Sequence, residues 1–200
     1  MFALDVPYSS IDAEIFFNKV LFKKIKAMLK VEKNEYGKTI SGSPLVAYHI
    51  TRKKLRGDSI QVTPLPSETL IGKEKRRSIN LLPINRTINN DSHHRSIIVL
   101  GRTGASDVSG SFIVEGMVDY LMDNVEFESM KRVFDFYFVP VANIDGVRYG
   151  NTLTNLTGSN LNNNWKTPNR YYQAEIFSLK EYLQEINKEA PISLIINLTA

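Results

Sequence analysis

Side chains able to bind a metal or act as nucleophiles are scarce in this sequence, which has three histidines and no cysteine. Disulfides, thiolate metal sites and cysteine nucleophiles are therefore excluded, and a metal would have to bind His, Asp or Glu. His49 has no second histidine or acid at metal-ligand spacing, so we expect it to contact a neighbour within a strand. His93 and His94 precede an apolar segment, which would place them at the amino end of a strand.

Polar segments that could hold a ligand follow the apolar stretches, at residues 102–109, 142–165 and 199–200. In open α/β sheets ligands gather beyond the carboxyl ends of the strands, so these segments are the places where a site is expected. Asp107 stands at the start of a helical pattern, where we expect it to cap the helix or interact with its dipole. Asp145 lies in an Ile-Asp-Gly sequence and is expected to form a turn.

Hydrophobic periodicity identifies the elements that would position these segments. We predict helices over residues 11–30, 109–124 and 174–188, and strands over residues 45–51, 59–63, 96–101, 133–141 and 192–198. The residues expected to face inward are Ile11, Ile15, Leu21, Ile25, Met28 and Leu29 in the first helix, Phe112, Ile113, Met117, Tyr120 and Leu121 in the second, and Ile176, Leu179, Leu183 and Ile186 in the third. Alternating helices and apolar strands predict an α/β fold with helices on both faces of the sheet.

Composition and charge describe an ordinary globular chain of 200 residues, with 42% hydrophobic and 23% charged residues. One hydrophobic core is expected at this length. Residues 1–100 hold 17 Lys+Arg against 9 Asp+Glu, whereas residues 101–200 hold 8 against 12. The basic clusters lack interleaved aromatic residues, so we do not expect nucleic-acid binding. The sequence has no secretory leader and no apolar run of membrane-spanning length, and a cytoplasmic location is the expectation.

The Gly/Asn-rich segment reads N-I-D-G-V at 143–147, G-N-T-L at 150–153 and G-S-N-L-N-N-N-W at 158–165. It resembles the carboxypeptidase A-type zinc peptidases, whose patterns are N-P-D-G-V, G-N-x-R and G-x-D-L-N-R-N-W. The sequences F-A-L at 2–4, P-Y-S at 7–9 and G-K-T-I-S-G-S-P-L at 37–45 are similar to the cytosolic carboxypeptidase branch, which trims glutamates from tubulin tails. The resemblance implies part of a carboxypeptidase-like fold with a mixed, mostly parallel sheet.

The resemblance also assigns the zinc-binding positions, and there the residues differ. The family's H-P-G-E aligns with G-A-S-D at 104–107 and its D-L-H-G with N-L-T-A at 197–200. The ligand positions are thus occupied by Gly104, Asp107 and Thr199. A glycine offers no donor and a neutral hydroxyl is a poor zinc ligand, so no zinc or other cofactor is expected.

Further positions that the family uses for chemistry are also changed. The arginine that would stabilise the oxyanion corresponds to Leu153, and the arginine that would bind the substrate carboxylate corresponds to Asn163, while Asn162 beside it is retained. The aspartate that would orient a zinc-bound imidazole corresponds to Asn160. We therefore expect vestigial substrate-binding positions at Asn162, Asn163 and Leu153 and no catalytic residue.

Relative to the family, residues 1–200 are expected to form the first part of a catalytic domain, without the preceding β-sandwich domain and the later half. Three hypotheses stay open. The chain is a catalytically inactive metallocarboxypeptidase-like protein that binds an acidic peptide or tubulin tail, an active zinc carboxypeptidase with substituted ligands that removes glutamates, or a structural fragment without a site. The sequence does not indicate an oligomeric state.

Overall fold

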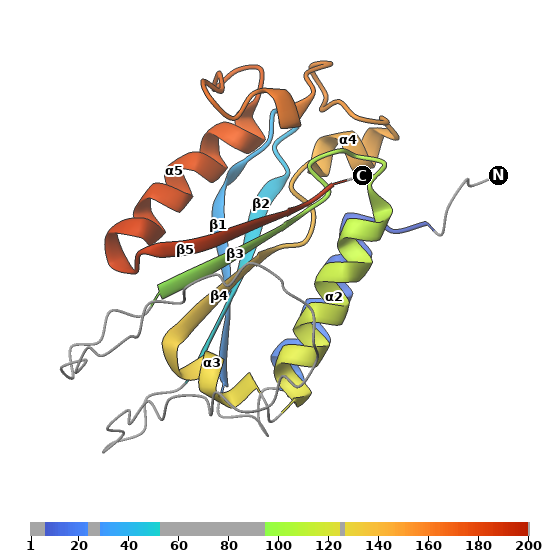
Figure 1. Ribbon diagram of the computed structural model, residues 1–200. Coiled ribbons are helices and arrows are strands. Elements are labelled where there is room, and N and C mark those ends of the chain that lie inside the picture. The colour runs from blue at the N-terminus through green and yellow to red at the C-terminus, as the bar shows by residue number, and fades with distance from the viewer. Residues whose placement is uncertain (1–6, 24–28, 53–94, 125–126, 200) are drawn as a thin grey trace, which may run out of the picture. The chain divides into compact units, whose positions relative to one another are not determined.

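The computed structural model describes residues 7–23, 29–52, 95–124 and 127–199. They form one five-stranded sheet in the order β1-β2-β4-β3-β5, shown in Figure 1. The strands are β1 (Leu29–Lys38), β2 (Pro44–Arg52), β3 (Arg95–Gly101), β4 (Phe134–Val139) and β5 (Ile192–Leu198). The helices are α1 (Ser10–Lys23), α2 (Val108–Asp123), α3 (Glu128–Val133), α4 (Ile144–Tyr149) and α5 (Ala174–Glu189), with a 3₁₀ turn at Leu161–Asn163. None of the described helices is long and apolar enough to cross a membrane.

The sheet is mixed. β1 pairs with β2 and β2 with β4 in antiparallel fashion, whereas β3 pairs in parallel with both β4 and β5. It follows that four of the five strands point in the same direction and β2 alone opposes them. The expected mixed α/β sheet is confirmed, and the parallel part of it directs the carboxyl ends of β3 and β5 to one end of the molecule.

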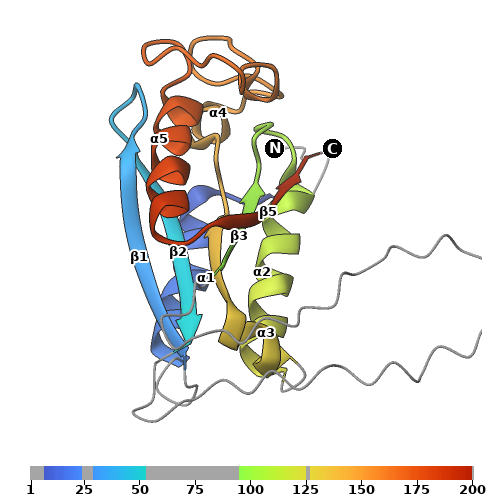
Figure 2. The ribbon, with the colours of Figure 1, turned by 60° about the vertical axis from the view of Figure 1, so that its left-hand side comes forward.

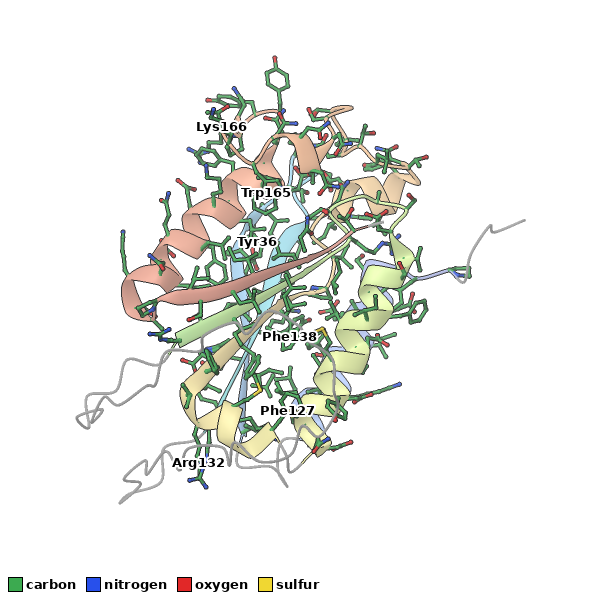
Figure 3. All side chains as sticks on the ribbon, viewed as in Figure 1. Tyr36, Phe127, Arg132, Phe138, Trp165 and Lys166 are labelled. Carbon is green, nitrogen blue, oxygen red and sulfur yellow. The ribbon has the colours of Figure 1, made fainter. Side chains whose placement is uncertain are left out.

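Helices cover both faces of the sheet, as Figure 2 shows for α5 on one face and α1 and α2 on the other. Along β3, Ile97 and Val99 join the core beneath α1 and α2, while Ile98 and Leu100 join the core beneath α5. Burial on both faces explains why β3 reads as an unbroken apolar run. In Figure 3, Phe138 lies on the α2 side of the sheet and Trp165 on the α5 side.

Two helices bury a side that agrees only in part with the prediction. Leu21 of α1 and Met117 and Leu121 of α2 contact the core as expected, whereas the other predicted residues that the structure describes in these helices do not. Ile11 and Ile15 of α1 are 64% and 47% exposed, and the helix packs instead through Phe17, whose ring stacks on Tyr48 at 3.8 Å. In α2, Phe112, Ile113 and Tyr120 are exposed, and the buried residues are Gly110, Ser111, Val114, Val118 and Leu121.

Close packing of α2 against the sheet explains this orientation. A Cβ atom at Gly110 would lie 2.7 Å from the carbonyl oxygen of Leu198, so only a glycine allows the helix to approach β5 this closely. Small residues of α2 therefore face the sheet. Because α2 is apolar on most sides, some of its largest apolar side chains remain exposed.

Several other boundaries differ from the sequence predictions. The first helix ends at Lys23, and Leu29 and Lys30 begin β1, a strand that the sequence did not predict because charged residues interrupt it. The Gly/Asn-rich segment that begins at residue 143, for which no helix was predicted, contains α4 and the 3₁₀ turn. The third helix, with all four of its inward residues buried, and the strand at 192–198 are confirmed. The strand expected at 59–63 and both His93 and His94 lie outside the described residues.

His49 contacts its neighbours in the sheet, as predicted. Its ring stacks on Tyr137 of β4 with a centroid separation of 4.2 Å. Its Nδ1 lies 3.7 Å from a carboxylate oxygen of Glu32 on β1, and its Nε2 lies 3.8 Å from one of Asp135 on β4. The imidazole thus lies between side chains of β1 and β4, in register with Tyr137 of β4 and away from the loops that follow β3 and β5.

Candidate functional site

The loops that follow β3 and β5 meet at one end of the sheet because these two strands are parallel neighbours. Figure 1 shows this end, where the chain leaves β5 beside α4 and the start of α2. The loop after β3 carries Gly104 and Asp107, the residue after β5 is Thr199, and the 3₁₀ turn brings Asn162 to the same place. The position of each side chain therefore follows from the strand order.

Asp107 and Thr199 are in direct contact. The Thr199 hydroxyl donates a hydrogen bond of 2.7 Å to Oδ2 of Asp107, whose side chain is only 4% exposed. A Cβ atom at Gly104 would lie 2.5 Å from the same carboxylate oxygen. The three positions that the resemblance assigns to zinc ligands thus lie together, and the carboxylate of Asp107 fills the space that a side chain at residue 104 would need.

A chain of hydrogen bonds extends from this contact. Asn162 Nδ2 donates to the Thr199 hydroxyl at 3.2 Å, and Asn197 Nδ2 donates to Asn162 Oδ1 at 3.3 Å. The Thr103 hydroxyl donates to Asn197 Oδ1 at 3.2 Å. All four bonds run in the same direction and end on the carboxylate of Asp107, so each one polarises the next toward the negative charge. We call Thr103, Asn197, Asn162, Thr199 and Asp107 the polar chain.

Asp107 was expected to cap α2 or to interact with its dipole, and the capping hydrogen bond is not formed. The residue occupies the N-cap position with φ −75° and ψ 58°, but its side chain makes no capping hydrogen bond. The carboxylate turns instead toward the hydroxyl of Thr199. The hydroxyl of Thr199, which follows β5, is thus the hydrogen-bond donor to Asp107 in place of the amide groups at the start of α2.

Arg102 shapes the loop that carries Gly104 and Asp107. Its φ of 52° lies in the left-handed region, which a side chain other than glycine adopts at some cost in energy. The buried guanidinium donates from Nε to the carbonyl oxygen of Ala105 at 3.1 Å and from Nη1 to that of Tyr8. Burial lowers the pKa of Arg102, and the nearby charge of Asp107 opposes this effect. Its hydrogen bonds hold the loop in the strained conformation.

Asn143 fixes α4 to the same loop. Its Oδ1 accepts from the amide of Gly146 at 3.0 Å, which caps α4, and its Nδ2 donates to the carbonyl oxygens of Thr103 and Thr154. A Cβ atom at Gly146 would lie 2.5 Å from the Thr154 oxygen, so this glycine is required for the close approach. These contacts form the framework that the family-like motif preserves.

Asp145 has a longer-range role than the local turn expected of it. Its side chain is fully buried and accepts hydrogen bonds from the Thr39 hydroxyl at 2.8 Å and from the amide of Ser41 at 3.1 Å. Both partners lie in the connection between β1 and β2. Asp145 therefore joins α4 to the β-hairpin on the other side of the sheet.

The remaining predicted positions lie around the polar chain. Asn160 accepts at Oδ1 from the amide of Asn162 at 3.0 Å and so caps the 3₁₀ turn. Asn163 is exposed, and Leu153 is 45% exposed. Of the three positions that the resemblance predicts to be vestigial substrate-binding residues, only Asn162 belongs to the polar chain.

The donors at the ligand positions do not match a zinc site. Zinc in a catalytic site takes three protein ligands and leaves one position open for water. Here one position has no side chain, one is a hydroxyl, and the single carboxylate already accepts from that hydroxyl. Within the described part of the chain, no group of three His, Asp or Glu residues has a geometry that would hold a metal.

Sequence reasoning missed three polar residues near the site. Thr103 and Asn197 belong to the polar chain; Asn197 lies two residues before Thr199, on the same side of β5, which is the signal that could have identified it. Glu175 in the first turn of α5 is 1% exposed and accepts from Asn155 Nδ2 at 3.1 Å. Burial raises the pKa of Glu175.

Comparisons with known proteins all lead to one family. A sequence profile described as zinc carboxypeptidase matches residues 24–197. Cytosolic carboxypeptidase 6 of Caenorhabditis elegans is 25% identical over 137 residues, which are 66% of this chain and 30% of that protein. Cytosolic carboxypeptidase 1 of Mus musculus is 33% identical over 89 residues, which are 44% of this chain and 7% of that protein.

Solved structures show the same fold. A metallo-carboxypeptidase from Pseudomonas aeruginosa superposes with a TM-score of 0.63 at 20% identity, covering 96% of this chain and 39% of that one. Carboxypeptidase A from Helicoverpa armigera gives 0.62 at 14% identity, covering 98% of this chain and 46% of that one. The chain therefore spans less than half the length of these proteins.

Proposed function

The chain belongs to the zinc carboxypeptidase family, and from this premise we propose that it is a catalytically inactive member in which hydrogen bonds have replaced the metal. The observation that carries the proposal is the 2.7 Å hydrogen bond between Thr199 and Asp107, with Gly104 beside it. Two former ligand positions bind each other, and the third provides no donor. Without a Lewis acid, no step of peptide hydrolysis is assigned to these residues.

The losses extend beyond the metal. A carboxypeptidase needs a cation to stabilise the oxyanion and another to bind the substrate carboxylate. At the corresponding positions stand Leu153, which is apolar and half exposed, and Asn163, which is neutral. Asn162 is committed to Asn197 and Thr199. These replacements support an inactive protein rather than an enzyme with substituted ligands.

We further propose that the protein binds acidic peptide segments, as the resemblance to enzymes that act on glutamate-rich tails suggests, and that it does so in the cytoplasm. Residues 146–173 contain Arg148, Lys166 and Arg170 and no Asp or Glu. All three cations are exposed, and Figure 3 shows Lys166 projecting from the loop region beyond α5. Part of the basic excess of residues 1–100, the charge asymmetry noted in the sequence, lies at residues 53–94, outside the described residues.

Thermal unfolding with and without zinc tests the inactive state. A metal that binds the folded chain raises its melting temperature. At a metal concentration one hundred times the dissociation constant, the free energy of unfolding increases by about 2.7 kcal/mol. We expect no shift for the natural chain. A repaired variant with G104H, D107E, T199H and N160D serves as the matched comparison, because it restores the family's donors on the same backbone. A zinc-dependent rise for the natural chain that D107A abolishes would contradict the proposal.

A further inference from the structure

A cavity of about 440 Å³ lies between the start of α1, the strands β1 and β2, and α4. Every residue that lines it belongs to the described part of the chain, and none of them is a member of the polar chain. Pockets that bind ligands usually measure roughly 300–1,000 Å³. The cavity is therefore large enough to receive a group from a ligand, and its lining indicates which kind of group.

Most of the cavity wall is apolar. The apolar side chains come from β2, from the segment after β4 and from α4, and they include Val46, Tyr48, Pro140, Val141, Ile144 and Val147. Ala13 of α1 and Val141 belong to a small hydrophobic cluster against which Ile144 and Val147 pack. This packing fixes α1 against α4, so the cavity is formed before a ligand arrives. Its wall favours an apolar group, because such a group gains free energy when it leaves water.

Arg148 of α4 is an exposed cation at the rim of the cavity, and its guanidinium group is held in place. Nη1 donates a hydrogen bond to the hydroxyl of Ser43, a residue that is only 5% exposed. The Ser43 hydroxyl lies 3.0 Å from that of Ser41, which donates to Oδ1 of Asp145 at 2.5 Å. A series of side chains thus leads from the buried carboxylate of Asp145 to Arg148 and fixes the position of its charge.

The charge of Arg148 is available to a ligand. Among the described residues, no acidic side chain forms an ion pair with it. The two other charged residues of the lining, Lys33 and Glu14, bind each other through an ion pair of 2.7 Å. Arg148 therefore provides the net charge of the lining. A matching ligand carries a carboxylate beside an apolar group, because a guanidinium binds a carboxylate through charge-assisted hydrogen bonds.

We propose that this cavity receives an apolar side chain of the acidic peptide, and that Arg148 binds the carboxylate of a residue next to it in the peptide. The inference rests on the proposed binding of acidic peptides and adds a sequence preference to it. A peptide of glutamates alone uses only the charge of Arg148, whereas a leucine between glutamates also fills the apolar part of the cavity. Because Ser43 holds the guanidinium, Arg148 loses little side-chain freedom on binding.

Fluorescence anisotropy at low salt tests the preference with two labelled peptides, a glutamate-rich peptide with one central leucine and the same peptide with serine in place of the leucine. We expect the natural chain to bind the leucine peptide about tenfold more tightly, because only leucine gains free energy by leaving water. Equal affinities for the two peptides would overturn the inference, and this comparison needs no variant.

V147F tests whether the cavity is the site of the preference, because the larger ring occupies space that the leucine would need. The difference between the two peptides should fall below about twofold, while the affinity for the serine peptide stays within about twofold of the natural value. V133F is the matched control, because Val133 is also partly buried but lies before β4, whereas the cavity lies beyond the end of β4. A V147F variant that keeps the tenfold preference would overturn the inference.

R148Q tests the contact with the neighbouring carboxylates. Replacing the glutamates beside the leucine by glutamines should weaken binding to the natural chain and to K166Q, but it should hardly affect binding to R148Q, where the partner of those carboxylates is already absent. Equal losses in R148Q and K166Q would overturn the inference. If neither peptide binds at low salt, the proposed peptide binding itself fails together with the inference. Binding of both peptides without a preference for leucine refutes the role of the cavity alone.

Discussion

Replacing Thr199 by valine tests whether the polar chain stabilises the fold. T199V keeps the shape of the side chain but removes the hydroxyl that donates to Asp107 Oδ2 and accepts from Asn162 Nδ2. A hydrogen bond to a charged group contributes about 1.5–3 kcal/mol. Asp107 is buried, but Thr199 is exposed, so water can replace part of the lost donor. We therefore expect a loss of about 1 kcal/mol in the free energy of unfolding.

Urea unfolding and thermal melting of T199V measure this loss, which corresponds to a melting temperature lower by about 2–4 °C for a chain of this size. T199S retains the hydroxyl and should stay close to the natural chain. T167V, at an exposed threonine of the loop before α5, controls for the general effect of Thr→Val. If T199V is as stable as T167V, or T199S is as damaging as T199V, the hydroxyl does not hold Asp107 and the reasoning is refuted.

Three further outcomes follow from the packing and the charges. Burial raises the pKa of Glu175 above its unfolded value, so the natural chain should lose stability as the pH rises through the folded-state pKa. E175Q should remove this loss, and in urea titrations at neutral pH its free energy of unfolding should exceed that of the natural chain by about 1–3 kcal/mol. G110V should lower the free energy of unfolding by about 1–3 kcal/mol, because its Cβ would lie 2.7 Å from the Leu198 carbonyl oxygen. G116V is the control, because Gly116 faces open space and its replacement should cost no more than the helix propensity of valine. Equal losses for the two variants would refute this prediction. A glutamate-rich peptide should bind at low salt and dissociate when salt shortens the screening length to about 8 Å. Neutralising Arg148, Lys166 and Arg170 together should weaken this binding. An affinity that does not depend on salt would refute the proposal of electrostatic peptide binding.

The sequence allowed α5 and β3 to be placed because their burial is strongly periodic or continuous. β5 could be placed from its apolar and β-branched residues, although none of them is buried in the described part of the chain. β1 escaped prediction because an exposed edge strand carries charges that a buried strand does not. The inward face of α2 was predicted only in part, for Met117 and Leu121, because Gly110, a residue without a side chain, decides how closely the helix approaches β5. Close approach of backbones leaves no hydrophobic signal in the sequence.

The site was partly predictable for a topological reason. Parallel strands bring their carboxyl ends together, so Gly104, Asp107 and Thr199 could be expected near one another from the sequence. Which hydrogen bonds form there could not be expected, since the partner of Asp107 was a choice between the amides of α2 and a hydroxyl 92 residues away.

Elemental analysis of the full chain, purified from zinc-containing medium without chelators, tests the central claim most directly. The claim is that Thr199 and Asp107 bind each other where the family binds zinc, and that Gly104 supplies no ligand. The account predicts far less than one zinc per chain, with no difference between the natural chain and D107A. About one zinc per chain, lost in D107A, would contradict it.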